Sequence, residues 1–284
     1  MSEAHCEPAA PVVSAVPGAV QIALVGNPNV GKTTLFNALT GLSAKVSNYP
    51  GITVERRVGA IVLPQGPAEL HDLPGTYSLN ARSAEEQIAF DAIAGLAHRA
   101  PDVLVVCLDA TQLARSVYLL LQCRELGARC VGALTMVDEA GETAADAKAL
   151  GELVGCEVVA VTARTKRGLP ELMSAIDRAA RAGRRSEWKW SPSPTLRGHL
   201  DAILLPTGWR ANVRYNAEVT RADDAIKLWA LTCIDNSRDD ADELQNVPDT
   251  LRAAVAARRF DLDDEAVLAR WKWLDREIPK LGQP

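Results

Sequence analysis

The chain has 284 residues, of which 48% are hydrophobic and 24% charged, and its formal net charge at pH 7 is −5. This composition excludes a wholly disordered chain, a collagen-like fibre and a low-complexity protein. The length allows about two domains, and the negative charge argues against a nucleic-acid binder or a polybasic membrane-surface protein. We therefore expect a soluble globular protein in which any contact with phosphate is local.

The cysteines, histidines and apolar runs of the sequence indicate neither a metal site nor a membrane span. The six cysteines include no C-x-x-C pair, so we interpret them as reduced thiols of a cytosolic protein. The four histidines lack the H-E-x-x-H spacing of a zinc site. No apolar run approaches the roughly 18 residues that a spanning helix needs.

The first 19 residues are rich in proline and small side chains, so we expect a disordered tail. From residue 20 to about residue 181, strand-like and helix-like patterns alternate. The predicted strands are 21–25, 61–63, 69–72, 103–109, 131–137 and 157–162, and the predicted helices are 31–42, 84–96, 113–126, 143–153 and 169–181. This alternation predicts an α/β fold with a mostly parallel sheet covered by helices on both faces.

The composition changes at residues 183–194, where we expect a domain boundary. The remaining sequence looks helical and contains all six tryptophans. Residues 187–284 carry 14 basic and 17 acidic side chains, a net charge of −3, which argues against an RNA-binding appendage. The residues that recur at helical spacing, and that we expect to anchor a small helical core, are Leu268, Trp271, Leu274 and Ile278.

Residues 26–33 read G-N-P-N-V-G-K-T between a predicted strand and a predicted helix, which fits the phosphate-binding motif G-x-x-x-x-G-K-[ST]. Backbone N–H groups of such a loop and the helix N-terminus bind phosphate. Lys32 would reach the outer phosphates and Thr33 would ligate Mg²⁺. The nucleotide contacts predicted from this segment are Gly26, Asn27, Asn29, Val30, Gly31, Lys32, Thr33 and Thr34.

Three further elements follow the loop in the order found in guanine-nucleotide switch proteins. Asp72–Gly75 reads D-L-P-G, in which Asp72 would hold Mg²⁺ through water and the Gly75 N–H would meet the terminal phosphate. T-M-V-D and T-A-R close the next two predicted strands. The residues of these two segments predicted to contact the nucleotide are Thr135, Met136, Asp138, Thr162, Ala163 and Arg164.

With these motifs in place, the sequence resembles the cytosolic part of the ferrous iron transport protein B family. Residues 47–58, S-N-Y-P-G-I-T-V-E-R-R-V, are similar to the first switch of that family, and residues 72–79, D-L-P-G-T-Y-S-L, to its second. Residues 269–278 are similar to the segment that precedes the membrane region there. The resemblance covers 20–181 with specific motifs and 187–284 more loosely.

The resemblance implies a Ras-like GTPase domain over 20–183 and a helical domain over 184–284 that is regarded as slowing nucleotide release. It also implies a membrane-embedded iron-permeation part of the same polypeptide, which would follow Pro284, and a place at the cytoplasmic face of the bacterial inner membrane. The implied cofactors are GTP or GDP, Mg²⁺ and K⁺. From the negative charge we expect no nucleic acid among the partners, and the possibility of an oligomer stays open.

The residues expected to be catalytic are Lys32 and Gly75, from the motifs above, and Asn29 and Thr53, from the resemblance. Thr53 would complete Mg²⁺ binding, and K⁺ coordinated by Asn29 would supply the positive charge that an arginine finger supplies elsewhere. Thr76 stands where Ras-type enzymes have the glutamine that orients water, so slow hydrolysis is expected.

The base-recognition motif departs from the family at Thr135, where an asparagine is usual. A threonine hydroxyl is too short both to bond the N7 edge of guanine and to brace the phosphate loop. Asp138 can still accept hydrogen bonds from guanine N1–H and the 2-amino group. We expect weak GTP binding with guanine preferred, and use of ATP stays open.

Two other functions remain as alternatives at this point. One is an RNA-binding GTPase of ribosome assembly, which shares the N-x-G-K loop and the D-x-P-G segment but is disfavoured by the acidic last third. The other is a nucleotide-gated interaction module in which nucleotide binding, and not hydrolysis, carries the signal.

Overall fold

The computed structural model describes residues 18–41, 44–49, 53–80, 83–95, 99–141, 144–183, 186–205, 220–233 and 263–282. The strands are β1 (Val20–Gly26), β2 (Ala44–Asn48), β3 (Glu55–Leu63), β4 (Gly66–Asp72), β5 (Val103–Asp109), β6 (Cys130–Thr135) and β7 (Val158–Ala160). The helices of the first two thirds are α1 (Lys32–Thr40), α2 (Ala84–Ala94), α3 (Leu113–Glu125), α4 (Val137–Ala140), α5 (Ala147–Val154) and α6 (Leu169–Arg181). They are followed by α7 (Pro194–Ala202), α8 (Thr220–Cys233), α10 (Asp263–Glu277) and the 3₁₀ helix η2 (Ile278–Gly282). No helix in these ranges is long and apolar enough to cross a bilayer.

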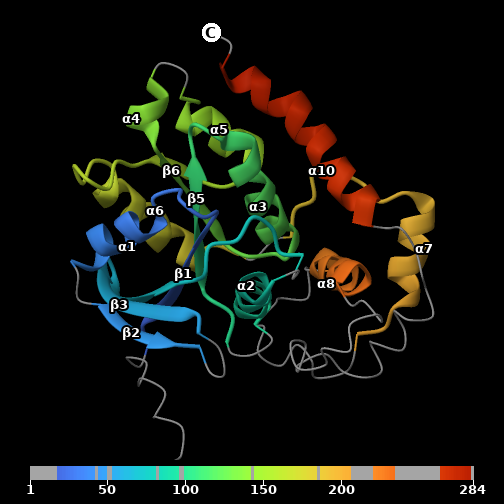
Figure 1. Ribbon diagram of the computed structural model, residues 1–284, viewed down its shortest axis with the longest axis horizontal. Helices are drawn as coiled ribbons and strands as arrows, with labels where there is room; N and C mark the ends of the chain where they lie inside the picture. Colours follow the sequence, from blue (N-terminus) through green and yellow to red (C-terminus); the bar gives the residue numbers. More distant parts are fainter. Residues whose placement is uncertain are drawn as a thin grey trace, which may run out of the picture.

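All seven strands form one sheet in the order β2-β3-β4-β1-β5-β6-β7 (Figure 1). The pairs from β4 to β7 are parallel, and β2, β3 and β4 pair antiparallel. The two-residue turn 64–65 joins β3 to β4. The predicted α/β fold with a mostly parallel sheet is therefore confirmed. The predicted strands 61–63 and 69–72 are the ends of longer strands, and β2 was not predicted.

The two faces of the sheet are covered by different helices because neighbouring residues of a strand point to opposite faces. In β1, Ile22 and Leu24 belong to the core shared with α1 and α6, whereas Ala23 and Val25 belong to the core shared with α2 and α3. All seven residues of β5 are buried, as expected for a central strand covered on both sides.

Several helix ends follow from capping residues. α1 lies between Gly31 and Gly41, which both have the left-handed backbone that favours glycine. The Ser83 hydroxyl accepts a hydrogen bond from the Glu86 N–H at the start of α2, at 3.2 Å. These caps make α1 and α2 slightly shorter than the predicted helices 31–42 and 84–96.

Three predicted elements between residues 131 and 162 differ from the structure. The predicted strand 131–137 is wrong in its last two residues, because Met136 has a φ of +54° and the short helix α4 begins at Val137. The helix predicted at 143–153 begins four residues later, where the Asp146 carboxylate accepts from the Ala149 N–H at 2.7 Å. The strand predicted at 157–162 is the shorter β7.

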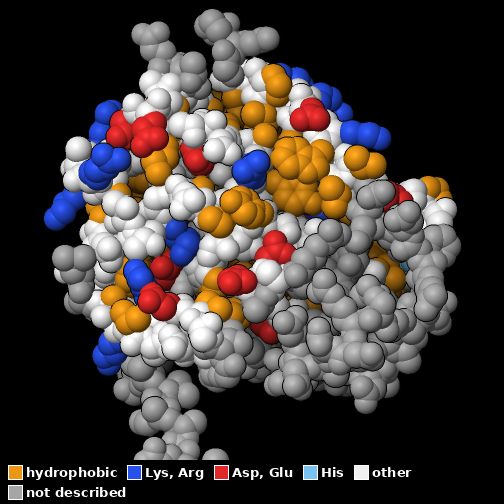
Figure 2. Space-filling model, in the orientation of Figure 1, with side chains coloured by type: hydrophobic (Ala, Val, Ile, Leu, Met, Phe, Trp, Pro, Cys, Tyr) orange, Lys and Arg blue, Asp and Glu red, His pale blue; other side chains and the backbone are white. Residues whose placement is uncertain are grey.

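Of the helices after residue 186, α8 and α10 pack against α2 and α3, and α7 packs against α8. The Trp229 ring of α8 stacks on Phe90 of α2 with 4.1 Å between ring centroids. The Trp271 ring of α10 stacks on Tyr118 of α3 at 5.4 Å. Hydrophobic side chains also gather on the surface along the contact between α10 and α3 (Figure 2). The helical part thus shares the core of the α2 and α3 face and adds a smaller core cluster of its own.

The predicted helical anchors are confirmed in part. Leu274 is fully buried and Trp271 is half-buried, but Leu268 is 52% exposed, so its prediction as an anchor is wrong. The helix turns about 100° per residue, which puts Leu268 outside the stripe that faces α3. Ile278 lies in η2, after the end of α10.

Cys107, Cys123 and Cys130 are buried and Cys156 is half-buried, and among the described residues none of these four thiols forms a disulfide. Burial raises the pKa of the Cys107 thiol to about 12, so this group stays protonated at neutral pH. Cys6 and the predicted tail up to residue 17 lie outside the described residues.

Candidate functional site

The carboxyl ends of β1, β4, β6 and β7 bring the four predicted motifs to one edge of the sheet. Parallel strands point the same way, so the loops that follow them meet at a common edge, where ligands of open α/β sheets bind. Leu24 and Asp72 are paired at the ends of β1 and β4, and Asp109 and Thr135 at the ends of β5 and β6. Motifs that are far apart in the sequence therefore lie close together at this edge of the sheet.

The phosphate loop fills the gap between β1 and α1. A Cβ atom on Gly26 would lie 2.9 Å from the Cβ of Cys107, so only glycine fits there between β1 and β5. Asn29 and Gly31 have φ angles of +66° and +79°, which turn the backbone around the loop. No side chain of the described residues caps the N-terminus of α1. Its N–H groups are therefore available to an anion.

Lys32, the first residue of α1, contacts the last residue of β4. Its ammonium forms an ion pair with the Asp72 carboxylate. Only 11% of the Lys32 side chain and 8% of the Asp72 side chain are exposed. The group predicted to bind phosphate and the group predicted to hold magnesium therefore lie together below the phosphate loop.

The D-x-x-G segment, residues 72–75, runs directly beneath the phosphate loop. The Thr76 N–H donates a hydrogen bond to the Gly26 carbonyl at 3.1 Å. A Cβ atom on Gly75 would lie 3.3 Å from the Cα of Pro28, a close approach that glycine allows. The Thr76 side chain is buried, and its hydroxyl donates to the Ser78 carbonyl at 2.6 Å. Thr76 is thus turned into the protein.

A pocket beside the loop brings the predicted base-recognition residues together. Its lining comprises Gly31, Thr34, Thr135, Met136, Asp138, Val161, Thr162, Ala163 and Arg164. The left-handed backbone at Met136 turns the chain at the end of β6, so that the exposed Asp138 lies at the rim. Arg164 lies 3.7 Å from the Glu139 carboxylate at the same rim. The T-M-V-D and T-A-R segments, which are separate in the sequence, therefore line the same pocket.

Thr135 is buried between the phosphate loop and β5. Its hydroxyl lies 2.8 Å from the Val30 carbonyl and 3.2 Å from the Leu108 carbonyl. A hydroxyl has one proton, so both contacts share it. Thr135 therefore braces the phosphate loop, and its proton is committed to backbone carbonyls.

The remaining predicted ligands differ in exposure. Asn29, Thr33 and Thr53 are exposed, whereas Asn27 is buried and its side-chain oxygen has no partner among the described residues. In the part of the chain that is described, no hydrogen bond joins Thr53 to the phosphate loop. The structure thus brings Asn29 and Thr33 to the rim of the site, while the approach of Thr53 stays a prediction.

Two residues near the site were not predicted from the sequence. Tyr49 follows β2, and burial raises its pKa to about 12. The charge on Arg56 lowers this pKa, and the charge on Asp72 raises it. Gln122 of α3 is buried and bonds the chain just after the D-x-x-G segment. The sequence feature that could have identified Gln122 is a polar side chain among the apolar residues of a predicted helix. For Tyr49 the sequence offered no such feature beyond its position in the segment similar to the first switch.

This fold and this arrangement of loops define a P-loop protein with a G-domain type of nucleotide site. The profile of the family described as ferrous iron transport protein B matches residues 20–176. The chain belongs to this family, which confirms the resemblance seen in the sequence.

Curated relatives and solved structures agree with that assignment. The Fe(2+) transporter FeoB of Salmonella typhimurium is 45% identical over 163 residues, which cover 55% of this chain and 21% of the relative. The structure of the cytosolic domain of L. pneumophila FeoB matches with a TM-score of 0.73 and 29% identity, over 93% of this chain and 100% of the other. The cytosolic domain of the T. maritima FeoB iron transporter in its GMPPNP form matches with a TM-score of 0.70 and 27% identity, over 92% and 98% of the two chains. The GDP form I of the same domain matches with a TM-score of 0.69 and 27% identity, over 93% and 98%.

Sequence matches to the curated relatives span only part of their length. The aligned region covers about a fifth of the Salmonella relative and about a quarter of the Leptospira biflexa one. The solved cytosolic domains are matched almost completely, including the helical part after the sheet.

Proposed function

We propose that this chain binds guanine nucleotide with Mg²⁺ and hydrolyses GTP, as the nucleotide-binding part of a ferrous iron transporter. The observation that carries the proposal is the convergence of the phosphate loop, the Lys32–Asp72 pair and the pocket at Asp138 on one edge of the sheet. The T. maritima relative was solved in GDP and GMPPNP forms, which supports a guanine nucleotide as the ligand.

The proposed binding mode gives each group a defined role. Loop N–H groups and the N-terminus of α1 hold the phosphates, and Lys32 leaves Asp72 to bind the outer ones. The oxygen donors of Thr33, Thr53 and Asp72 are the hard ligands that Mg²⁺ prefers. When bound there, Mg²⁺ neutralises charge on the outer phosphates. The pocket lined by Thr135, Asp138 and 162–164 receives the base.

Slow hydrolysis follows from the residues near the terminal phosphate. The Thr76 hydroxyl is bonded to the Ser78 carbonyl and is buried, so this side chain does not orient an attacking water. The exposed Asn29 offers an amide oxygen at the rim, which suits K⁺ as a source of positive charge. We therefore propose potassium-assisted turnover without a side-chain base.

Base selectivity rests on Asp138 in this proposal. Its carboxylate accepts from guanine N1–H and the 2-amino group, whereas adenine offers an acceptor at N1 and no 2-amino donor. The Thr135 proton is shared between two backbone carbonyls, so it is not available to N7 of the base. We propose weak GTP binding with guanine preferred, and use of ATP stays an open alternative.

The context of the whole protein is also a proposal. Fe(2+) transporter relatives extend well beyond the matched region, which supports a membrane-embedded iron-permeation part of the same polypeptide. The matched part would then lie at the cytoplasmic face of the bacterial inner membrane, with the helical part slowing nucleotide release. Family membership leaves the alternative of ribosome assembly without support, while a nucleotide-gated interaction module remains to be separated from a GTPase.

One set of measurements tests the proposal. Isothermal titration of GDP and GMPPNP with Mg²⁺ should give saturable binding, and single-turnover assays should give GTP cleavage. Absence of guanine-nucleotide binding would overturn the proposal. A conformational change on GMPPNP binding without any cleavage of bound GTP would favour the interaction module. Tight RNA binding in a low-salt filter assay would restore the ribosome-assembly alternative.

A further inference from the structure

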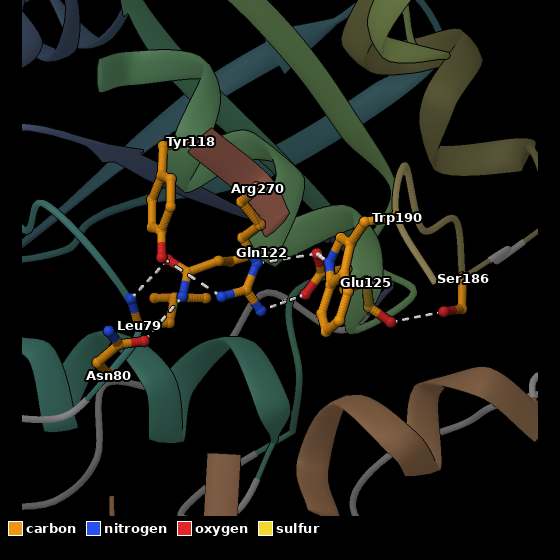
Figure 3. A network of polar contacts seen from close by, with 8 residues as sticks. All are labelled: Leu79, Asn80, Tyr118, Gln122, Glu125, Ser186, Trp190 and Arg270. Atoms are coloured by element: carbon orange, nitrogen blue, oxygen red, sulfur yellow. Dashed lines mark hydrogen bonds and ion pairs between the residues drawn. The ribbon is translucent and has the colours of Figure 1, made fainter. Parts of the chain in front are cut away.

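A buried glutamine of α3 holds the chain just beyond the D-x-x-G segment. The Gln122 side-chain oxygen accepts from the Leu79 N–H at 2.9 Å, and its amide nitrogen donates to the Asn80 side-chain oxygen at 3.0 Å (Figure 3). Gln122 is 6% exposed. Both ends of its amide therefore have partners in consecutive residues, and a buried polar group satisfied in this way has a defined orientation.

These bonds complete a two-point attachment of the segment. At one point the Thr76 N–H binds the Gly26 carbonyl of the phosphate loop, and at the other the Leu79 N–H binds Gln122. Only two residues separate Thr76 from Leu79. A change in the position of Gly75, next to Thr76, therefore reaches the Leu79 bond through a very short length of chain.

The next turn of α3 is attached to the helical part. Glu125 lies three residues after Gln122, and its carboxylate accepts two hydrogen bonds from the Arg270 guanidinium of α10, at 3.0 and 2.7 Å (Figure 3). The indole N–H of Trp190 donates to the same carboxylate at 2.8 Å, and the Ser186 hydroxyl donates to the Glu125 backbone carbonyl at 2.6 Å. Gln122 and Glu125, one turn apart on α3, thus hold the chain after the D-x-x-G segment and the helical part, respectively.

The Glu125–Arg270 ion pair is deeply buried, with side-chain exposures of 2% and 5%. Burial alone would lower the pKa of Arg270, but the Glu125 carboxylate more than offsets this effect and the pKa is raised. Arg270 therefore keeps its charge at neutral pH, and removal of either side chain of the pair would leave its partner buried without a counter-charge. A cavity of about 30 Å³, lined by Asn80, Gln122, Glu125 and Arg270 among others, lies between the two attachments.

We infer that Gln122 is a positioning residue for the D-x-x-G segment, and that the Glu125–Arg270 pair keeps it in place, so that α10 acts through α3 on the contact between Gly75 and the terminal phosphate. The attachment itself stands on the geometry, and its effect on a terminal phosphate rests on the proposed function. Such coupling is reciprocal, so a ligand that moves Gly75 also changes the contact between α3 and α10.

Hydrogen exchange in the protein without nucleotide tests the attachment. Gln122→Met keeps the side-chain length and removes both hydrogen bonds. We expect exchange at the Leu79 amide to become about five- to tenfold faster, since one buried hydrogen bond is lost. The matched control is Gln87→Met on α2, where the Gln87 amide bonds Asp91 of the same helix, and it should leave Leu79 unchanged.

The role of the ion pair needs variants that avoid a lone buried charge. Glu125→Gln with Arg270→Met removes both charges together, and Arg270→Lys keeps the charge while losing the two-bond geometry. Both should speed exchange at Leu79, although neither substitution touches it. The control pair, Arg197→Met with Asp224→Asn, removes an ion pair between α7 and α8 and should have no effect there.

Nucleotide affinities test the functional step, because GMPPNP has the terminal phosphate that GDP lacks. We expect Gln122→Met to lower the ratio of GMPPNP affinity to GDP affinity about fivefold, whereas general destabilisation would weaken both nucleotides alike. Unchanged exchange at Leu79 in both folded ion-pair variants would overturn the coupling, and an unchanged affinity ratio in Gln122→Met would overturn the positioning role. If the parent protein binds neither nucleotide, the proposed function fails, and the exchange data still decide the attachment.

Discussion

The Lys32 ammonium contacts the Asp72 carboxylate, so the charges assigned to phosphate binding and to Mg²⁺ binding neutralise each other. Both side chains are largely buried, and in that setting the ion pair has less screening than one at the surface. A nucleotide with Mg²⁺ offers each group a new partner of opposite charge. We therefore expect that, as the first step of binding, Lys32 and Asp72 separate and take the phosphates and Mg²⁺ as their new partners.

Lys32→Ala should lower GTP affinity at least about 100-fold, or roughly 2.7 kcal/mol. The substitution removes the positive charge below the loop and leaves the Asp72 carboxylate unpaired near the phosphates. The double variant Lys32→Ala with Asp72→Asn should regain part of the affinity in the absence of Mg²⁺, because it removes that repulsion. Isothermal titration measures both effects, with Lys45→Ala on exposed β2 as the control. A folded Lys32→Ala protein with parental GTP affinity would contradict the assigned site.

Potassium should accelerate GTP hydrolysis at least about tenfold over sodium, which corresponds to about 1.4 kcal/mol of the activation barrier. A fixed positive charge at the terminal phosphate stabilises negative charge as it develops there. Asn29→Ala should abolish the difference between the salts, while Asn37→Ala on α1 should retain it. Single-turnover rates in matched chloride salts provide the measurement. Equal rates in both salts for the parent protein would return Asn29 to a purely structural loop residue.

Arg270→Met alone should destabilise the fold by about 3–5 kcal/mol, because it leaves the Glu125 carboxylate buried without its ion-pair partner. Arg197→Met is the matched control, since the Arg197 side chain is 39% exposed and one of its two carboxylate partners, Asp201, is 64% exposed. The control should cost less than about 1 kcal/mol. Urea unfolding followed by circular dichroism gives both values. A loss for Arg270→Met no larger than that of the control would contradict the buried position of the pair.

The position of the candidate nucleotide site in the fold was predictable because each of its motifs is short and lies at the end of a buried strand. Gly26, Lys32 and Asp72 could be placed by their spacing from β1 and β4, and a parallel sheet brings such ends together. The strand β2 was missed because its sequence, A-K-V-S-N, has one large apolar residue and forms an exposed edge. Its pairing with β3 is a tertiary contact that no local pattern reveals.

Contacts between the sheet domain and the helical part could not be predicted. Gln122 meets Leu79, 43 residues away, and Arg270 meets Glu125, 145 residues away. Only the fold decides which polar residues of α3 are buried and what they meet. The prediction for Leu268 failed for a related reason, because a recurring apolar pattern indicates a helix but does not identify which face of that helix meets a neighbour.

Thr135→Asn should raise GTP affinity about five- to 150-fold, the equivalent of about 1–3 kcal/mol for one additional hydrogen bond in the pocket. The single proton of the Thr135 hydroxyl is shared by the Val30 and Leu108 carbonyls, whereas an asparagine amide has two N–H donors. One can brace the Val30 carbonyl while the other reaches N7 of the base. Titration of GTP into the parent, Thr135→Asn and the exposed control Thr165→Asn measures the gain.

Discrimination between GTP and ATP should change much less in that variant than the affinity itself. Guanine and adenine both carry an acceptor at N7, so the added bond strengthens both nucleotides by a similar factor. In the proposed binding mode the preference for guanine comes from Asp138. Its carboxylate would face the N1 lone pair of adenine without a 2-amino donor, and sites built on such bonds reject the wrong partner strongly. Competition of ATP against labelled GTP should therefore give similar selectivity in the parent and in Thr135→Asn, and Asp138→Asn should reduce it in both. Equal competition by ATP in the parent, or no gain in GTP affinity in Thr135→Asn, would contradict this description of the pocket.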